Sequence, residues 1–212
     1  MEVNSLKFDE WLKIFKKHVS KKLFSLSDLV VLTDEDKSSL SVQLSRLVKS
    51  NIVNRIARDW YENPFNSPSS EEVSMVLRHP CYLSMEYALF KLDILSQRAY
   101  TLTMITTKFP YIYKTVNAIY EYHQIKKSLF WGFKKSGTVA IAEPEKALLD
   151  LIYIRYSRNK DITIDRLYSL IDDMDIEELN QKKLFKYVRS FDSRTQKVLL
   201  NIFKKNNKII IG

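Results

Sequence analysis

Residues 44–61, LSRLVKSNIVNRIARDWY, decide the fold of the N-terminal part of the chain. An amphipathic helical pattern ends at Ser50, and Asn51 follows it as a single turn residue. Ile52–Ile56 then alternates apolar and polar residues, as a half-buried strand does, and Arg58-Asp59 interrupts the pattern before a second apolar pair. A helix, a stop, a strand, a basic tip and a return strand form the layout of a recognition helix that runs into the wing of a winged helix-turn-helix.

The residues upstream predict the rest of this unit. Phe8–Phe15 has a helical apolar pattern, and Leu23-Phe24 is expected to close a small core. Ser27 is expected to cap a second helix, because its hydroxyl can accept hydrogen bonds from the amides of the first turn. Asp36 is the expected cap of a third helix. On that helix, an arc of apolar residues is expected to face the core: Leu40, Leu44, Leu47 and Val48.

The opposite arc of the third helix is expected to face outward and to contact DNA bases. It holds Ser38, Val42, Ser45, Arg46 and Lys49, with Ser39 and Gln43 on its flanks. Small hydroxyls suit a close approach to base edges, and Val42 can touch a thymine methyl group. An ordinary alternative stays open, in which Val42 packs against a neighbouring domain and the lysines only keep the surface solvated.

Basic charge is concentrated on this segment. Lys37–Arg58 contains five basic residues and no acidic one, whereas residues 1–65 as a whole hold 11 Lys/Arg against 9 Asp/Glu. A surface that binds phosphates needs such a concentration of positive charge. The predicted DNA-binding residues are therefore Lys37, Ser38, Ser39, Val42, Gln43, Ser45, Arg46, Lys49, Arg55 and Arg58.

The composition of the 212 residues restricts the class of protein. A net charge of +9 and a pI near 9.4 favour an anionic partner without choosing between nucleic acid and a membrane surface. No apolar run approaches the roughly 20 residues that span a bilayer, and the N-terminus lacks the apolar region of a secretory signal. A single cysteine, Cys81, excludes an internal disulfide. We expect a cytoplasmic protein.

Several classes of catalytic and cofactor site are disfavoured. Only three glycines occur, so neither a P-loop nor a dinucleotide-binding fingerprint is present. The three histidines have no metal-type spacing. The acidic run Asp172–Glu178 contains a D-x-D pattern, but acids at the start of a helix are the more ordinary interpretation. We therefore predict no catalytic residues, no metal and no cofactor.

A change in composition predicts two domains. Residues 64–70 are rich in proline and serine and are interpreted as a linker between an N-terminal domain, 1–63, and a C-terminal domain, 71–212. The C-terminal domain is expected to be mixed α/β, so the whole chain is of the α+β class. Its basic stretches, 126–135 and 182–208, are either solvated faces or contacts for a partner, and the second could contact a phosphate backbone or an acidic protein.

Local patterns predict the elements of the C-terminal domain. Short helices are expected near 71–77 and, capped by Ser84, up to about Leu92, with a strand at 99–106. Two hairpins and a helix that begins at Pro144 follow. The expected hairpin strands are 109–115 with 118–125 and 129–134 with 138–142, the later helices are 164–171, 176–189 and 193–205, and a last strand is 209–211.

The order of these motifs resembles a known family. LSRLVKSNIVNRIARDWY, YLSMEYALFKLDIL, YTLTMITT, YEYHQI, LFWGF and EPEKALLDLIYIR occur in the order found in the AbiEi antitoxins of type IV toxin–antitoxin systems and their relatives among viral-defence transcriptional regulators. The resemblance spans roughly 44–155. Where relatives commonly have glycine, this chain has Asn51, Asp59 and Asp93, which best tolerate the left-handed backbone that glycine would supply. The acidic Asp59 leaves Arg55 and Arg58 as the better phosphate contacts of the wing.

The resemblance implies a non-enzymatic, two-domain antitoxin. The winged helix would bind operator repeats and repress its own operon, and the C-terminal domain would oppose a nucleotidyltransferase toxin encoded next to it. A stand-alone winged-helix regulator, whose C-terminal domain senses a ligand or dimerises, stays open as the alternative.

Overall fold

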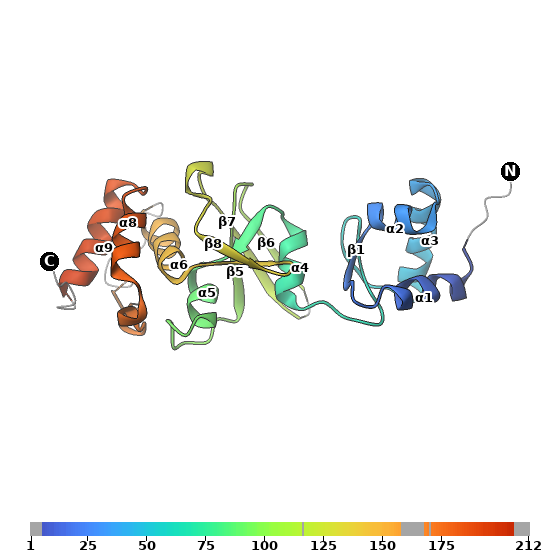
Figure 1. Cartoon of the computed structure of the whole chain (residues 1–212), viewed down its shortest axis with the longest axis horizontal. Helices are drawn as coiled ribbons and strands as arrows, with labels where there is room; N and C mark the ends of the chain where they lie inside the picture. Colours follow the sequence, from blue (N-terminus) through green and yellow to red (C-terminus); the bar gives the residue numbers. More distant parts are fainter. Residues whose placement is uncertain (1–5, 116, 158–167, 170, 206–212) are drawn as a thin grey trace. The chain divides into compact units, whose positions relative to one another are not determined.

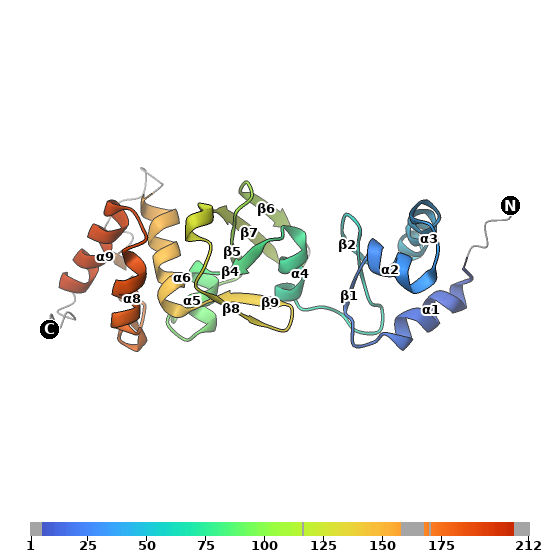
Figure 2. The same cartoon turned by 45° about the horizontal axis from the view of Figure 1, so that its top comes forward.

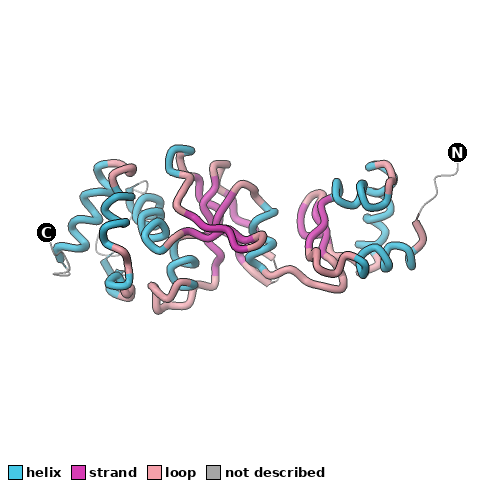
Figure 3. The backbone as a smooth tube through the Cα atoms, viewed as in Figure 1, coloured by secondary structure: helices cyan, strands magenta, loops and turns pink. Residues whose placement is uncertain are grey.

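The computed structural model describes residues 6–115, 117–157, 168–169 and 171–205. The chain divides into two compact units, Met1–Leu77 and Arg78–Gly212. Each unit combines helices with its own β-sheet (Figures 1 and 3), so the predicted α+β class is confirmed. The helix predicted at 164–171 falls mostly, and the strand predicted at 209–211 wholly, outside the described residues.

The first unit has three helices, a small sheet and a further short helix. Its elements are α1 (Phe8–Lys17), β1 (Leu23–Ser25), α2 (Leu26–Thr33), α3 (Lys37–Lys49), β2 (Arg55–Ala57), β3 (Trp60–Glu62) and α4 (Ser70–Leu77). The sheet is antiparallel with the order β1-β3-β2, so the β2–β3 hairpin lies beside a strand from the start of the unit.

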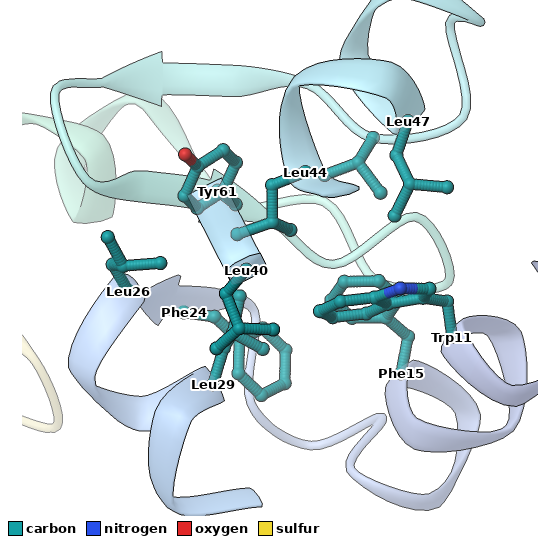
Figure 4. Packing of buried hydrophobic residues seen from close by; sticks show 10 residues of the cluster. Trp11, Phe15, Phe24, Leu26, Leu29, Leu40, Leu44, Leu47 and Tyr61 are labelled. Carbon is teal, nitrogen blue, oxygen red and sulfur yellow. The ribbon is translucent and has the colours of Figure 1, made fainter. Parts of the chain in front are cut away.

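Aromatic and leucine side chains from every part of this unit meet in one core. Trp11 stacks on Phe15 with a centroid distance of 5.7 Å, and Phe15 meets the edge of Phe24 at 5.4 Å. Figure 4 shows the α3 leucines lying over these rings. The predicted core residues Leu40, Leu44 and Leu47 are buried and Val48 is partly buried, which turns the opposite face of α3 outward.

Two local predictions for this unit were wrong. The cap of α2 is Ser25 rather than Ser27, because Ser25 Oγ accepts from the Asp28 amide at 3.1 Å while the Asp28 carboxylate accepts from the Ser25 amide at 2.7 Å. The first strand of the predicted wing begins at Arg55 rather than Ile52, because the Ile52 amide donates to the Leu47 carbonyl at 3.0 Å and so completes the end of α3.

The predicted linker is held at its beginning. Asn63 is buried, and its Nδ2 donates to the carbonyls of Phe15, His18 and Lys21 at 3.0–3.2 Å. Beyond the linker, Lys22 and Glu72 of α4 form an ion pair at 3.0 Å. The division between the units falls after Leu77, whereas the sequence predicted a linker at 64–70 and a second domain from residue 71.

The second unit is built on a six-stranded mixed sheet with the order β6-β7-β5-β4-β9-β8. Its strands are β4 (Cys81–Leu83), β5 (Thr101–Thr106), β6 (Tyr111–Lys114), β7 (Ile119–Gln124), β8 (Phe133–Ser136) and β9 (Val139–Ala142). The first predicted hairpin is confirmed as the antiparallel pair β6–β7. The second is the antiparallel pair β8–β9, but its first strand is Phe133–Ser136 rather than 129–134, because Lys127–Leu129 forms a 3-10 turn. The pairs β5–β7 and β4–β9 are parallel.

Helices pack beside the sheet and against each other (Figure 2). They are α5 (Met85–Lys91), α6 (Pro144–Leu151), the π-helical segment η2 (Ile152–Ser157), the 3-10 turns η1 (Lys127–Leu129) and η3 (Ile176–Glu178), α8 (Gln181–Val188) and α9 (Ser193–Lys205). Pro144 is the first residue of α6, as predicted. The helix predicted at 176–189 is two elements, because Asn180 accepts from the Lys183 amide at 3.0 Å and starts α8 anew.

Ser84 precedes α5 as predicted, but its side chain does not cap the helix. Its hydroxyl donates to Asp150 Oδ2 at 2.8 Å. Instead, Thr103 Oγ1 of β5 accepts from the Tyr87 amide at 3.1 Å and donates to the Ser84 carbonyl at 2.6 Å. The start of α5 is therefore fixed by the neighbouring strand.

Candidate nucleic-acid interface

The outward side of α3 is positioned by a cap at one end and by leucines beneath. The Asp36 carboxylate accepts from the amides of Ser38 and Ser39 at 2.8 and 3.0 Å. The hydrogen bond from the Ser38 hydroxyl, with these two amide bonds, lowers the pKa of Asp36. The charged carboxylate also suits the positive end of the helix, so the first turn of α3 is well defined at neutral pH.

Most of the predicted DNA-binding residues lie on exposed surface. We call Ser38, Val42, Ser45, Arg46 and Lys49 the outer face, and all five are exposed, as is Lys37. Val42 leaves 54% of its surface open to solvent, which is high for an apolar side chain and leaves it free to meet an apolar partner.

Gln43 was expected on the flank of this face, and the structure corrects that expectation. Only 5% of its surface is exposed, because its Oε1 accepts from Trp11 Nε1 and its Nε2 donates to Ser39 Oγ, both at 3.1 Å. Ser39 is half-buried and donates to Glu35 Oε2 at 3.1 Å. Both side chains hold α3 in place and are poorly presented to a base.

The two serine hydroxyls of the outer face already donate their hydrogens within the protein. Ser45 Oγ donates to the Ser41 carbonyl at 2.7 Å, and Ser38 Oγ donates to the Asp36 carboxylate. Each hydroxyl hydrogen is thus engaged, while the oxygen lone pairs remain. These serines are set to accept a hydrogen bond, as from the exposed amino group of adenine or cytosine in the major groove.

The β2–β3 hairpin adds two cations, Arg55 on β2 and Arg58 in the turn. Arg55 and Arg58 are exposed, and the turn is closed by Asp59, which has a left-handed φ of +62°. The Asp59 carbonyl accepts from the Leu26 amide at 2.8 Å, so this turn is tied to α2. Within the described residues, none of Lys37, Arg46, Lys49, Arg55 and Arg58 forms an ion pair.

A buried polar cluster in the second unit was not predicted. Lys146 and Asp150 on α6 form an ion pair with no exposed surface on either side chain. Tyr82 OH donates to Asp150 Oδ2 at 3.0 Å and accepts from Lys146 Nζ at 2.8 Å, and Ser84 also donates to Asp150. Burial lowers the pKa of Lys146 and raises that of Asp150, while their mutual attraction opposes both shifts. The available signal was the spacing of four residues in PEKALLD, which puts the two groups on one side of a helix.

Aromatic rings enclose this ion pair. Lys146 Nζ lies 5.3–5.4 Å from the ring centroids of Tyr82, Trp131 and Phe191. Gly132 has a φ of +75°, and a Cβ there would lie 2.9 Å from Lys146 Cγ. We interpret the cluster as structural, because it connects the sheet, α6 and the segment that precedes α9.

The backbone beside this cluster is strained. Met85 is fully buried and has a left-handed φ of +56°, a conformation that costs about 1–3 kcal/mol for such a residue. Ser84, which precedes it, is held by Asp150 through its hydroxyl and by Thr103 through its carbonyl. These bonds fix the entry into α5 and hold the strained residue in place.

The acidic run Asp172–Glu178 does not assemble into a metal site in the described part of the chain, where no group of three His, Cys, Asp or Glu side chains is arranged to hold an ion. Asp173 Oδ2 accepts from Gln97 Nε2 at 2.6 Å, and Asp175 precedes η3 without a side-chain capping bond. Searched over the described residues, no helix has the length and apolar character needed to cross a membrane. No protein-family model matches the chain, and no curated protein matches it either.

Proposed function

We propose that the first unit is a winged helix-turn-helix that binds double-stranded operator DNA, with α3 in the major groove and the β2–β3 turn as the wing. The order α1-β1-α2-α3-β2-β3 and the antiparallel sheet β1-β3-β2 support this proposal. The observation that carries it is the set of five exposed cations on α3 and the β2–β3 hairpin. None of them has an ion-pair partner within the described residues, and they lie with acceptor hydroxyls and an exposed valine. Exposed cations without partners are what phosphate neutralisation requires.

We further infer that the chain is an antitoxin and autorepressor of a type IV toxin–antitoxin operon, cytoplasmic and without enzymatic activity. The support is the resemblance to AbiEi antitoxins along 44–155. The three positions where the family commonly has glycine add to this support, because Asn51, Asp59 and Asp93 have left-handed φ values of 56–62°. The partner implied is a nucleotidyltransferase toxin encoded beside this gene.

A stand-alone winged-helix regulator is the second candidate. The second unit has its own sheet and core, and such a unit suits ligand sensing or dimerisation as well as antitoxin action. A nucleotidyltransferase gene next to this one favours the antitoxin, whereas metabolic genes favour the sensor.

Two experiments test the proposal. In the first, the full chain is titrated against a labelled duplex from upstream of its own gene and against a scrambled duplex. Arg46→Gln with Lys49→Gln should abolish the preference for the upstream duplex, while Lys108→Gln with Lys114→Gln, an equal loss of charge in the second unit, should retain it. Equal binding of both duplexes by the unmodified chain contradicts operator recognition.

In the second experiment, the chain is co-expressed with the neighbouring toxin and growth is followed. Relief of growth arrest supports the antitoxin assignment. If the full chain gives no relief while it still binds the upstream duplex, the stand-alone regulator becomes the better interpretation.

A further inference from the structure

A groove of about 250 Å³ lies between α1 and the C-terminal half of α3, within the first unit. Helical spacing creates it. Phe8 and Trp11 lie three residues apart on α1, and the α3 residues follow the spacing i, i+3, i+4, i+7, which places side chains on one side of a helix. The groove residues on this side are Gln43, Arg46 and Leu47 of α3 and Ser50, the residue that follows the helix.

The groove has an apolar floor and an open apolar wall. Trp11 and Leu47 form the floor with 1% and 7% of their surfaces exposed, and Figure 4 shows Leu47 above the Trp11 ring. Phe8 forms the wall and is 47% exposed. An aromatic wall beside a flat buried indole suits a small planar ring, which would remove Phe8 from water.

Among the residues that the structure describes, Arg46 is the only charged side chain that lines the groove. At 100° per residue, Arg46 lies about 80° around α3 from Ser38 and about 60° from Gln43, between the outer face and the groove. No ion pair of Arg46 occurs in the part of the chain that the structure describes. A guanidinium group offers two parallel N–H donors, which match a carboxylate.

We propose that this groove binds a small planar aromatic carboxylate, with the ring packed against Phe8 above the Trp11 floor and the carboxylate on Arg46. The groove of about 250 Å³ has room for one or two fused rings and is smaller than the roughly 300 Å³ at which drug-sized sites begin. Occupation turns Arg46 away from the outer face.

A regulatory consequence rests on the proposed DNA-binding function. Arg46 cannot pair with a ligand carboxylate and a guanine at the same time, so the ligand and operator DNA compete for one side chain. Each must then weaken the binding of the other by the same factor.

The first test uses no DNA and decides the groove itself. The ¹⁵N-labelled full chain is titrated with 2-naphthoate and, separately, with the neutral 2-naphthalenemethanol, and the Trp11 Nε1–H signal is followed by NMR. It is identified by the loss of the other two indole signals in Trp60→Phe and Trp131→Phe. We expect naphthoate to shift the Trp11 signal and to bind at least tenfold more tightly than the alcohol.

Three variants complete this test. Arg46→Gln should lose the preference for the acid, Phe8→Ala should weaken both compounds, and Lys13→Gln, an equal loss of charge on α1 outside the groove, should change neither. Equal affinities for acid and alcohol, or unchanged naphthoate binding in Arg46→Gln, would overturn the proposal.

The second test measures binding of the upstream duplex with and without saturating naphthoate. A loss of at least tenfold in operator affinity, which requires more naphthoate in Phe8→Ala, supports competition for Arg46. Naphthoate bound in the groove with operator affinity unchanged overturns the competition. If the chain binds no operator at all, the proposed function fails, and the NMR titration still decides the groove.

Discussion

The indole N–H of Trp11 donates a hydrogen bond to Oε1 of Gln43 at 3.1 Å, and both side chains are buried. This bond joins α1 to α3 at the base of the groove. It also accounts for a glutamine in a position that helical periodicity assigns to the edge of the outer face.

Gln43→Leu tests this bond. The substitution leaves the Trp11 N–H buried without an acceptor, at a cost of about 1–3 kcal/mol in the free energy of unfolding. Ser41→Ala, at an exposed position of the same helix, should change stability by less than about 0.5 kcal/mol. Urea unfolding of the two variants measures the difference, and equal stabilities would argue against a structural role for the bond.

Gly132 and Gly137 form a matched pair. Both have positive φ, so alanine introduces backbone strain at either position, but only at Gly132 would the new Cβ collide with Lys146. Gly132→Ala should therefore lower the melting temperature well below that of Gly137→Ala. Differential scanning calorimetry checks the order, and the reverse order would contradict the packing of Gly132 on the Lys146 side chain.

The buried Lys146–Asp150 pair should show strong coupling. Lys146→Met or Asp150→Leu alone leaves an uncompensated buried charge, which costs about 3–5 kcal/mol. The double variant removes both charges and should lose much less than the sum of the single losses. Denaturant unfolding of the four proteins gives the coupling energy, and simple additivity would mean that the charges do not depend on each other.

The free energy of unfolding should depend on Glu121 at acidic pH. His123 and, against the opposing effect of burial, Arg155 lower the pKa of Glu121 to about 2. His123 Nε2 lies 3.0 Å from Glu121 Oε1. Because the folded pKa lies below the unfolded value, the stabilisation is present above pH 4.5 and is lost as the pH falls towards 2.

Glu121→Gln should flatten this dependence between pH 4.5 and 2. Urea unfolding measured at several pH values tests it, with Glu178→Gln, at an exposed position, as the control. If Glu121→Gln loses as much stability at acidic pH as the unmodified chain, other carboxylates cause that loss.

Salt dependence should report the number of phosphates neutralised. If four or five of Lys37, Arg46, Lys49, Arg55 and Arg58 neutralise phosphates, log affinity against log salt concentration has a slope of about −4. Arg58→Ala should reduce its magnitude by about one unit on specific and scrambled duplexes alike. Fluorescence anisotropy at several salt concentrations measures the slope, and a value near zero excludes this surface.

Hydrophobic periodicity and charge patterns predicted the helices and strands better than they predicted the contacts between these elements. The third helix, its Asp36 cap, the β6–β7 hairpin and the start of α6 at Pro144 follow from local rules and are confirmed. A rule that requires only a hydroxyl group near the start of a helix does not distinguish Ser25 from Ser27. The choice between them depends on Asp28, which reciprocates only with Ser25.

Interactions between distant residues were beyond such rules. Gln43 is polar and lies on a helix flank, so nothing local separates it from its exposed neighbours. Its burial depends on Trp11, 32 residues away. Lys146 and Asp150 have the spacing of an ordinary surface pair, and only the rings brought by Tyr82, Trp131 and Phe191 enclose them.

The left-handed bends on either side of α3 have a consequence for the stability of this segment. Asp34 precedes the helix with a φ of +55° and Asn51 follows it with a φ of +56°. Glycine would relax each bend but would also enlarge the set of unfolded conformations, by about 0.4–1 kcal/mol of chain entropy per position. With Asp and Asn in these places, the unfolded chain has fewer conformations to give up. A glycine at either position would therefore stabilise the fold only if the relaxed bend returned more free energy than this entropy costs.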